Sequence, residues 1–213
     1  MIKIHPSSLS KIMTMAKGKT NGPEVLSVGA LTHCYDLAKQ FVYNYYPEIN
    51  SKYLDKGNLC ENDSIALYNS VYGTNHRKNE TRKENEYLSG ECDIEDNDII
   101  VDIKTPWSLV QFPALPHQAH DPDYEWQGRG YMILWDKPKF RLSFCLVSTP
   151  EDLIKYEDEN LHYVDLIDPR LRVTSVDYER DEDKDKLIEI KCRAAQAQAE
   201  IYIEAITNKY LAY

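Results

Sequence analysis

Two patterns of apolar residues run along the chain, one spaced at three to four residues and one strictly alternating. Together with cap and breaker residues, the first pattern predicts helices. Ser7 or Ser8 is expected to cap the first helix, and Gly73 to end the third. The expected helices cover residues 7–16, 28–45, 56–72, 123–135, 149–156 (also capped) and 181–211. In the last, helical spacing is kept by Ile190, Ala194, Ala197, Ile201, Ala205 and Tyr210.

Alternation predicts a hairpin within "GECDIEDNDIIVDIKT" (90–105), turning at Asp96 and Asn97. A third strand is expected at 140–148, where strand-forming residues are dense. Strands placed between helices favour an α/β fold with a central mixed sheet flanked by helices.

Two stretches lack a regular pattern. Residues 74–86 are polar and charged and are expected to form an exposed connector. Residues 107–123 contain three prolines and are expected to form a long loop. Loops of this length in a compact domain are often functional.

Alternation divides the hairpin side chains between two faces. With a turn at Asp96 and Asn97, one face carries Asp93 diagonal to Asp102, Glu91 directly opposite Asp102, and Lys104 farther along the strand. Carboxylates this close repel each other unless positive charge lies between them. The other face is apolar and is expected to lie on the core: Cys92, Ile94, Ile99, Val101 and Ile103.

A divalent cation would explain this group of charges. Asp93, Asp102 and the backbone carbonyl of Ile103 offer the oxygen ligands that Mg²⁺ or Mn²⁺ binds while keeping several waters. Lys104 cannot bind a cation, but its ammonium can orient an attacking water or neutralise charge on a phosphate. The pattern therefore predicts phosphodiester hydrolysis.

Glu61 adds a third acid, on the helix before the hairpin. It shares a helix face with Ile65, Tyr68 and Tyr72, so it is expected to point inward, where a metal-bound water would be a partner. The alternative is that Glu61 only begins a helix, where the helix dipole stabilises an acidic side chain.

The expected helix at 123–135 carries Gln127 and Tyr131 one turn apart on one face. Gly128 and Gly130 lie between them, and each costs a helix about 1 kcal/mol relative to alanine. Their presence predicts a close approach of the backbone, either to the sheet or to a DNA strand.

Composition limits the class of protein. The length of 213 residues and the hydrophobic content of 42% fit one domain, residues 1–213. No apolar run suits a membrane span or a secretory signal, so a soluble intracellular protein is expected. Five scattered cysteines are expected to be reduced and buried. A net charge of −10 argues against an overall basic surface but allows DNA in a confined positive channel.

The order of these elements resembles the PD-(D/E)xK nuclease superfamily and its restriction-endonuclease-like core. Within it, the chain resembles the phage recombination exonucleases of the lambda exonuclease and YqaJ type, from residue 7 to about 154. The matching segments are "HPSSLSKIM", "KGNLCENDSIALY", "NEYLSGECDIEDNDIIVDIKTPWSLVQFP", "YEWQGRGYMILW" and "FRLSFCLVSTPEDLI".

The resemblance implies a role for each matching residue. Asp93 and Asp102 would be metal ligands, assisted by the Ile103 carbonyl, and Glu61 would act directly or through water. Lys104 would be the catalytic lysine. Gln127 matches the glutamine of a Q-x-x-x-Y motif near the active site, and the residues expected to contact DNA are Ser8, Arg129 and Tyr131.

The resemblance also implies an activity. It is that of a Mg²⁺-dependent, ATP-independent deoxyribonuclease, with Mn²⁺ able to substitute. The enzyme would resect linear duplex DNA 5′ to 3′ in the host cytoplasm and leave a 3′ single strand for an annealing protein. Lambda exonuclease is a trimeric ring threaded by DNA, and such a homo-oligomer would reconcile the acidic net charge with DNA binding.

The sequence departs from the family at two positions of the hairpin. Cys92 replaces the name-giving proline, which leaves the Asp93 carboxylate in place. Glu91 stands where lambda exonuclease has a small polar residue by the phosphate, and an acid there disfavours a 5′ phosphate. No counterpart of the N-terminal phosphate-binding arginine is evident, so dependence on a 5′-phosphorylated end stays open.

Three alternatives remain. An endonuclease of the same superfamily would share the active site and differ in substrate topology. A CRISPR-associated nuclease would usually hold an iron–sulfur cluster, which the isolated cysteines disfavour. An inactive DNA-binding module is disfavoured by the intact acids and lysine. Within the long loop, Trp107 and Phe112 would either separate DNA strands or anchor the loop.

Overall fold

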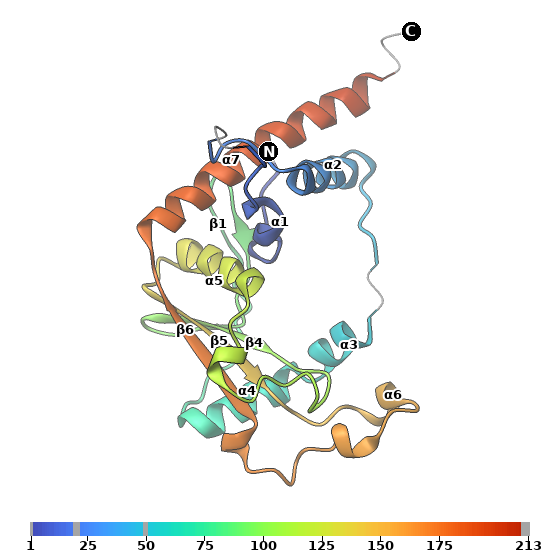
Figure 1. Cartoon of the computed structure of the whole chain (residues 1–213), viewed down its shortest axis with the longest axis vertical. Helices are drawn as coiled ribbons and strands as arrows, with labels where there is room; N and C mark the ends of the chain where they lie inside the picture. Colours follow the sequence, from blue (N-terminus) through green and yellow to red (C-terminus); the bar gives the residue numbers. More distant parts are fainter. Residues whose placement is uncertain (1, 19–21, 49–50, 210–213) are drawn as a thin grey trace.

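A four-stranded sheet with the order β3-β4-β5-β6 lies at the centre of the computed structural model, which describes residues 2–18, 22–48 and 51–209 (Figure 1). β4 and β5 are parallel, and both outer pairs are antiparallel. The predicted mixed sheet is therefore confirmed. The strands are β3 (Ile94–Glu95), β4 (Ile99–Lys104), β5 (Lys139–Cys145) and β6 (Val173–Glu179), and a separate pair is formed by β1 (Lys83–Glu84) and β2 (Ser89–Gly90).

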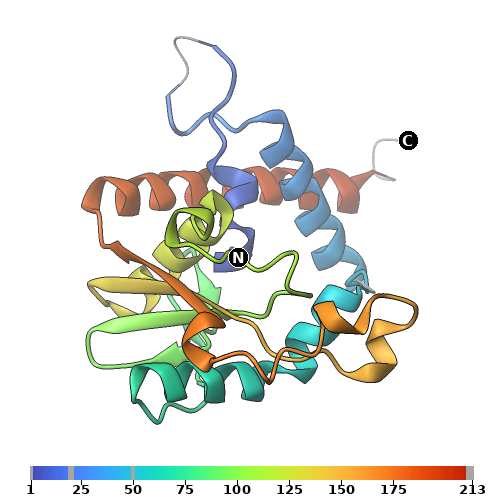
Figure 2. The same cartoon turned by 60° about the horizontal axis from the view of Figure 1, so that its bottom comes forward.

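Helices cover both faces of this sheet, and a further helical layer lies beyond α5 (Figures 1 and 2). The helices are α1 (Leu9–Met13), α2 (Val28–Tyr43), α3 (Lys52–Leu59), α4 (Glu61–Tyr72), α5 (Pro122–Trp135), α6 (Glu151–Ile154) and α7 (Glu182–Asn208). Short 3-10 helices lie at Pro6–Ser8, Pro116–Gln118, Glu159–Leu161 and Pro169–Leu171. None of the described helices is long and apolar enough to cross a membrane.

Both faces of β4 are buried. Val101 and Ile103 pack with Ile94 against α4, as the alternation predicted, while Ile100 packs against α5. Cys92 was expected beside Ile94 but lies in the α5 core. It precedes the two-residue strand β3, so regular alternation does not extend to it. All five cysteines are buried and unpaired, as expected.

The hairpin turns one residue later than predicted. Asp96 N–H donates to the Ile99 carbonyl (3.0 Å), which makes Asn97 and Asp98 the turn residues. Glu95 therefore pairs with Ile100 instead of Asp98. The Lys137 ammonium fixes this turn by donating to the carbonyls of Asp96 and Asn97 (3.0 Å each) and pairing with Glu95 (3.1 Å).

Helix ends follow local chemistry. Ser27 Oγ accepts from Ala30 N–H (3.2 Å) at the start of α2, and Gly73 ends α4 with φ +67°. Neither expected serine caps α1, because the chain enters it through a 3-10 turn and Ser8 is already helical. α6 is shorter than expected and begins after Pro150, which offers no side-chain cap.

Three other expectations about secondary structure were wrong or incomplete. The helix expected at 56–72 is two helices that meet at Cys60, whose backbone leaves the helical region. Residues 74–86 include the short strand β1, which pairs with β2. The strand β6 was not predicted, although Thr174, Val176 and Tyr178 alternate toward the core.

The C-terminal helix exists, but its buried face differs from the expected one. Ile190 and Ile201 are exposed, and Tyr210 lies outside the described residues. The reason is that two polar residues of the buried face reach backbone carbonyls: Lys191 bonds Val25 (3.1 Å), and Gln196 bonds Ile2 (2.7 Å) and Glu86 (3.1 Å). The buried residues are Ile188, Lys191, Cys192, Ala195, Gln196 and Ala199.

The two glycines of α5 are explained by packing within the protein. A Cβ at Gly128 would overlap the buried Phe140 ring on β5, and one at Gly130 would lie 2.7 Å from Leu9 Cδ1. The helix can therefore approach the sheet and α1 closely only with glycine at these positions.

Gly128→Ala is expected to lower the free energy of unfolding by about 1–3 kcal/mol, because overpacking Phe140 outweighs the better helix propensity of alanine. Gly57→Ala in α3 is the matched control, since its Cβ would meet nothing within 4 Å. That change is expected to stabilise the protein by up to about 1 kcal/mol. Urea unfolding followed by circular dichroism measures both, and a Gly128→Ala variant as stable as wild type would contradict the packing argument.

Candidate active site

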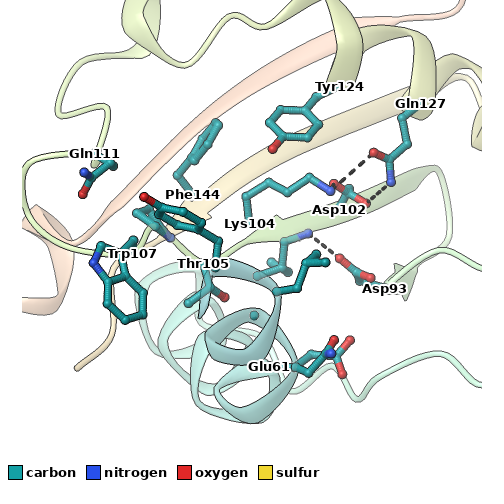
Figure 3. Close-up of a pocket in the computed structure, with 16 residues that line it drawn as sticks. Glu61, Asp93, Asp102, Lys104, Thr105, Trp107, Gln111, Tyr124, Gln127 and Phe144 are labelled. Atoms are coloured by element: carbon teal, nitrogen blue, oxygen red, sulfur yellow. Dashed lines mark hydrogen bonds and ion pairs between the residues drawn. The ribbon is translucent and has the colours of Figure 1, made fainter. Parts of the chain in front are cut away.

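A pocket of about 620 Å³ opens beside the C-terminal end of β4, between α3, α4 and α5 (Figure 3). It brings together the five side chains expected to carry chemistry: Glu61, Asp93, Asp102, Lys104 and Gln127. Its remaining lining consists of Tyr53, Leu54, Gly57, Asn58, Ile103, Thr105, Pro106, Trp107, Gln111, Tyr124 and Phe144. One end is therefore charged, and the other is largely aromatic.

Asp102, Lys104 and Gln127 form one connected group. Lys104 Nζ lies 2.6 Å from Asp102 Oδ2 and 3.4 Å from Gln127 Oε1. Gln127 Nε2 donates to Asp102 Oδ1 (3.1 Å), so the amide orients both charged side chains from α5 (Figure 3). Asp102 is only 2% exposed, which strengthens these interactions relative to the same contacts in water.

Lys104 remains charged in this setting. Burial disfavours its ammonium, but the Asp102 carboxylate outweighs burial and the pKa of Lys104 is raised. Its Nζ also lies 4.5 Å from the ring centroid of Tyr124, a cation–π arrangement. Lys104 can therefore donate hydrogen bonds to a phosphate or a water, and it is not a general base at neutral pH.

Asp93 faces Asp102 because of the hairpin register. Extending the pairing of Ile94 with Val101 by one residue sets Asp93 across from Asp102, instead of diagonal to it as predicted. Asp93 Oδ2 accepts from Ile103 N–H (2.6 Å). Burial, followed by the negative charge of Asp102, raises the pKa of Asp93 to about 7.

Glu91 does not face Asp102. It lies before β3, outside the observed pairing with β4, and its carboxylate forms a 3.8 Å ion pair with Arg82. The predicted contact between Glu91 and Asp102 is therefore wrong, for the same reason as the diagonal placement of Asp93. Glu91 is not among the residues that line the pocket.

The two aspartates suit a divalent cation of the Mg²⁺ type. Among the described residues, no three His, Cys, Asp or Glu side chains gather closely enough to hold a metal by themselves. Mg²⁺ is usually held by one or two carboxylates together with waters and substrate phosphates. Asp102 Oδ2 is buried and faces the Lys104 ammonium at 2.6 Å. A carboxylate oxygen has two lone pairs, so one remains available to a cation.

Glu61 begins α4 and lines the same pocket. Its carboxylate forms an ion pair with Lys78 (2.5 Å), on the connector between α4 and β1. Glu61 was expected either to point inward or only to begin a helix. It does both. Lys78 was not identified from the sequence, because a lysine in a polar connector has no distinguishing pattern.

The expected DNA-contact residues lie at or beyond the edge of the pocket. Tyr131 is buried, and its hydroxyl contacts Gln127 Nε2 (3.3 Å), so it supports the glutamine from one turn away. Arg129 is 5% exposed and pairs with Glu125 (2.8 Å), and contact with DNA would require it to leave this pair. Ser8 lies at the end of the first 3-10 helix and does not line the pocket.

Sequence reasoning also missed the lysine that supports the pocket floor. Lys56 on α3 is fully buried, and its ammonium donates to the carbonyls of Pro106 (2.7 Å), Trp107 (3.0 Å) and Val147 (2.9 Å). It thereby ties the segments that follow β4 and β5 to each other. A charged residue in a helix normally signals exposure, so composition gave no indication of this role.

The aromatic end of the pocket is anchored. Trp107 is 3% exposed and its Nε1 donates to Glu157 Oε2 (2.8 Å), while Phe112 packs with Leu146 and Val164. Of the two readings of the long loop, anchoring is therefore the one that these contacts support.

Asp93→Asn is expected to stabilise the protein in the absence of divalent cations. Folded Asp93 keeps its proton up to about pH 7, whereas the unfolded chain loses it near pH 4. The folded state therefore binds more protons between these values, and its stability falls as the pH rises through this window. Asparagine removes the cost and still accepts from Ile103 N–H.

The gain in the free energy of unfolding should be about 1–2 kcal/mol in EDTA at pH 8 and should shrink toward pH 5. Asp98→Asn, in the exposed turn, is the control and should change stability by less than about 0.5 kcal/mol. Urea unfolding at the two pH values measures both, and a destabilised Asp93→Asn variant at pH 8 would refute the proposed repulsion.

Comparisons with known proteins identify the family. Neither a protein-family model nor a curated protein matches the chain. The crystal structure of a phage-related exonuclease from Haemophilus somnus 129PT matches with a TM-score of 0.89 and 31% identity, over 98% of this chain and 96% of that one.

The alkaline exonuclease LHK-Exo from Laribacter hongkongensis shares the fold, with a TM-score of 0.73 and 16% identity over 99% of this chain and 94% of that one. The structure of LHK-Exo in complex with dAMP matches with a TM-score of 0.70 and 17% identity, over the same shares of the two chains. The match to the Haemophilus exonuclease shows that the chain belongs to the phage-related exonucleases, which are the lambda exonuclease and YqaJ type of the PD-(D/E)xK nucleases.

Proposed function

We propose that this nuclease is a Mg²⁺-dependent, ATP-independent exonuclease that resects linear duplex DNA in the 5′ to 3′ direction. The observation that carries the proposal is the convergence of Asp93, Asp102, Lys104 and Gln127 in one pocket, where the buried Asp102 carboxylate faces the Lys104 ammonium. That donor set supports the proposed need for metal and the proposed substrate chemistry, and the family resemblance supports the proposed polarity.

Asp93 and Asp102 would hold the cation, with the Ile103 carbonyl assisting and Glu61 contributing directly or through water. When bound, Mg²⁺ supplies positive charge for the charge that develops on the scissile phosphate, and Mn²⁺ can replace it. The Asp93 carboxyl must lose its proton for this, and a cation between the two aspartates favours that loss.

Lys104 places a fixed positive charge next to the same phosphate. Its ammonium is already oriented by Asp102 and Gln127, so little rearrangement is needed as charge develops in the transition state. Gln127 holds the two charged side chains at their distances, and Tyr131 supports Gln127. Two aromatic side chains of the pocket, Tyr124 next to Lys104 and Phe144, offer flat surfaces to a base.

The cellular context is proposed from the family resemblance. The 3′ single strand would pass to an annealing protein in the host cytoplasm, and the active form would be a homo-oligomer, with a trimer favoured. In such an assembly the DNA is enclosed, which would accommodate a net charge of −10.

An endonuclease of the same superfamily is the second candidate, and an inactive DNA-binding module is the third. The endonuclease would use the same residues and would also cut covalently closed circular DNA. The inactive module would bind DNA without releasing nucleotides. Substrate topology and product analysis separate all three functions.

Digestion of linear duplex DNA, labelled separately at each 5′ and 3′ end, should release the 5′ label first and only when Mg²⁺ is present. Closed circular DNA of the same sequence should resist until it is linearised. Samples are taken over time, with and without EDTA and without ATP. Cleavage of the closed circle would favour the endonuclease, and full activity in EDTA would exclude the metal mechanism.

Lys104→Ala should lower the rate of digestion by at least about a hundredfold, because it removes a preorganised charge that stabilises the transition state. Its fold and DNA binding should remain, as shown by circular dichroism and by duplex binding in Ca²⁺. Lys139→Ala is the control, since Lys139 begins the neighbouring strand β5 and is exposed. Wild-type activity in Lys104→Ala would rule out the proposed role of this lysine.

A further inference from the structure

The connector between α4 and β1 runs beside the strand segment that carries the first aspartate. Asn79 N–H donates to the Asp93 carbonyl (2.7 Å), and Asn79 Nδ2 donates to the Cys92 carbonyl (3.0 Å). Two hydrogen bonds therefore fix the backbone next to Lys78. The position of Lys78 beside Glu61 is therefore set by the fold and does not depend on its side chain alone.

Lys78 points at Glu61, with 2.5 Å between its Nζ and Glu61 Oε2. The pKa of Lys78 is raised, first by this hydrogen bond and further by the nearby carboxylates of Glu61, Asp93 and Glu91. Two of these acids, Glu61 and Asp93, are also proposed to contribute to the cation site.

The ion pair between Lys78 and Glu61 is partly exposed, and it lies beside open space. The side chains of Lys78 and Glu61 are 44% and 25% exposed, and ion pairs this exposed contribute little to stability. Lys78 also lines a second, polar cavity of about 630 Å³, together with His76 and Arg77. The ammonium therefore has open space beside it when it leaves Glu61.

We propose that Lys78 is a further residue of the proposed reaction: it neutralises Glu61 while the site lacks metal, and it turns to a phosphate of the bound strand when a divalent cation takes over the carboxylates. The inference rests on the proposed function, because it assigns Lys78 to Glu61, which lines the active-site pocket. A bound cation lowers the negative charge that holds the ammonium, and a phosphate supplies a new negative partner.

The proposal predicts opposite effects on two ligands. Without Lys78, the cation no longer competes with an ammonium for Glu61, so metal should bind more tightly. A phosphate of the DNA loses a positive partner, so DNA should bind more weakly. If the ion pair were purely structural, its loss would weaken the binding of both metal and DNA. It would not strengthen one and weaken the other.

The first test is Mn²⁺ binding to the DNA-free protein, measured from the electron paramagnetic resonance signal of free Mn²⁺. Lys78→Met should bind Mn²⁺ about three- to tenfold more tightly than wild type, and Lys78→Arg should return to the wild-type value. Lys186→Met is the matched control, because Lys186 pairs with Asp183 on α7, and Asp183 does not line the pocket. Unchanged or weaker Mn²⁺ binding by Lys78→Met would overturn the proposal.

The second test is binding of linear duplex DNA in Ca²⁺ over a series of salt concentrations. Lys78→Met should bind about five- to tenfold more weakly at 100 mM salt, and the slope of log K against log salt should fall by about one. Lys78→Arg should restore the slope, and Lys186→Met should match wild type. An unchanged slope in Lys78→Met would also overturn the proposal.

The wild-type protein separates this inference from the proposed function. Wild type that binds neither Mn²⁺ nor duplex DNA would contradict the proposed function and with it the role of Lys78. Wild type that binds both, while Lys78→Met behaves identically, would contradict the role of Lys78 alone. Thermal melting by circular dichroism checks that the variants are folded.

Discussion

The active site depends on holding two carboxylates, Asp93 and Asp102, close together where little water reaches them. Repulsion between like charges grows as the surroundings become less polar, so each carboxylate needs a compensating partner. Asp102 receives the Lys104 ammonium and the Gln127 amide, and Asp93 receives the Ile103 N–H. β4 supplies two of these partners, the Lys104 ammonium and the Ile103 N–H, and α5, which packs on the strand, supplies the Gln127 amide. The compensation is incomplete, because the charge of Asp102 still raises the pKa of Asp93.

Much of this site could be predicted because it follows from strand alternation. Period-two alternation puts Asp102 and Lys104 on the same face of one strand, and helical spacing puts Gln127 and Tyr131 on one face of α5. The register of the hairpin could not be predicted. It depends on a hydrogen bond within the turn and on Lys137, which is about 40 residues away in the sequence. Local rules fix which side of a strand a residue occupies, but tertiary contacts fix what lies opposite it.

Two of the remaining errors share one cause, which is the burial of polar side chains with long reach. Lys56 is hidden beneath the pocket, and Lys191 and Gln196 occupy the buried face of α7. Each satisfies backbone carbonyls from distant segments, so each is stable inside the protein although its type signals exposure. The apolar stripe expected on α7 was displaced for this reason. The missed strand β6 is different: its alternation was present, but a short segment beside charged residues was not recognised.

The tie between Lys137 and the hairpin turn affects how the chain folds. A slip of two residues between β3 and β4 keeps every side chain on its original face, so hydrophobic burial hardly distinguishes the two alignments. The slipped form would be compact and soluble, yet its aspartates would no longer face each other. Selection between alignments then depends on polar contacts at a surface turn on the far end of β4. A fraction of molecules trapped in the wrong alignment would be folded but inactive, so specific activity would report the accuracy of strand pairing as well as the chemistry.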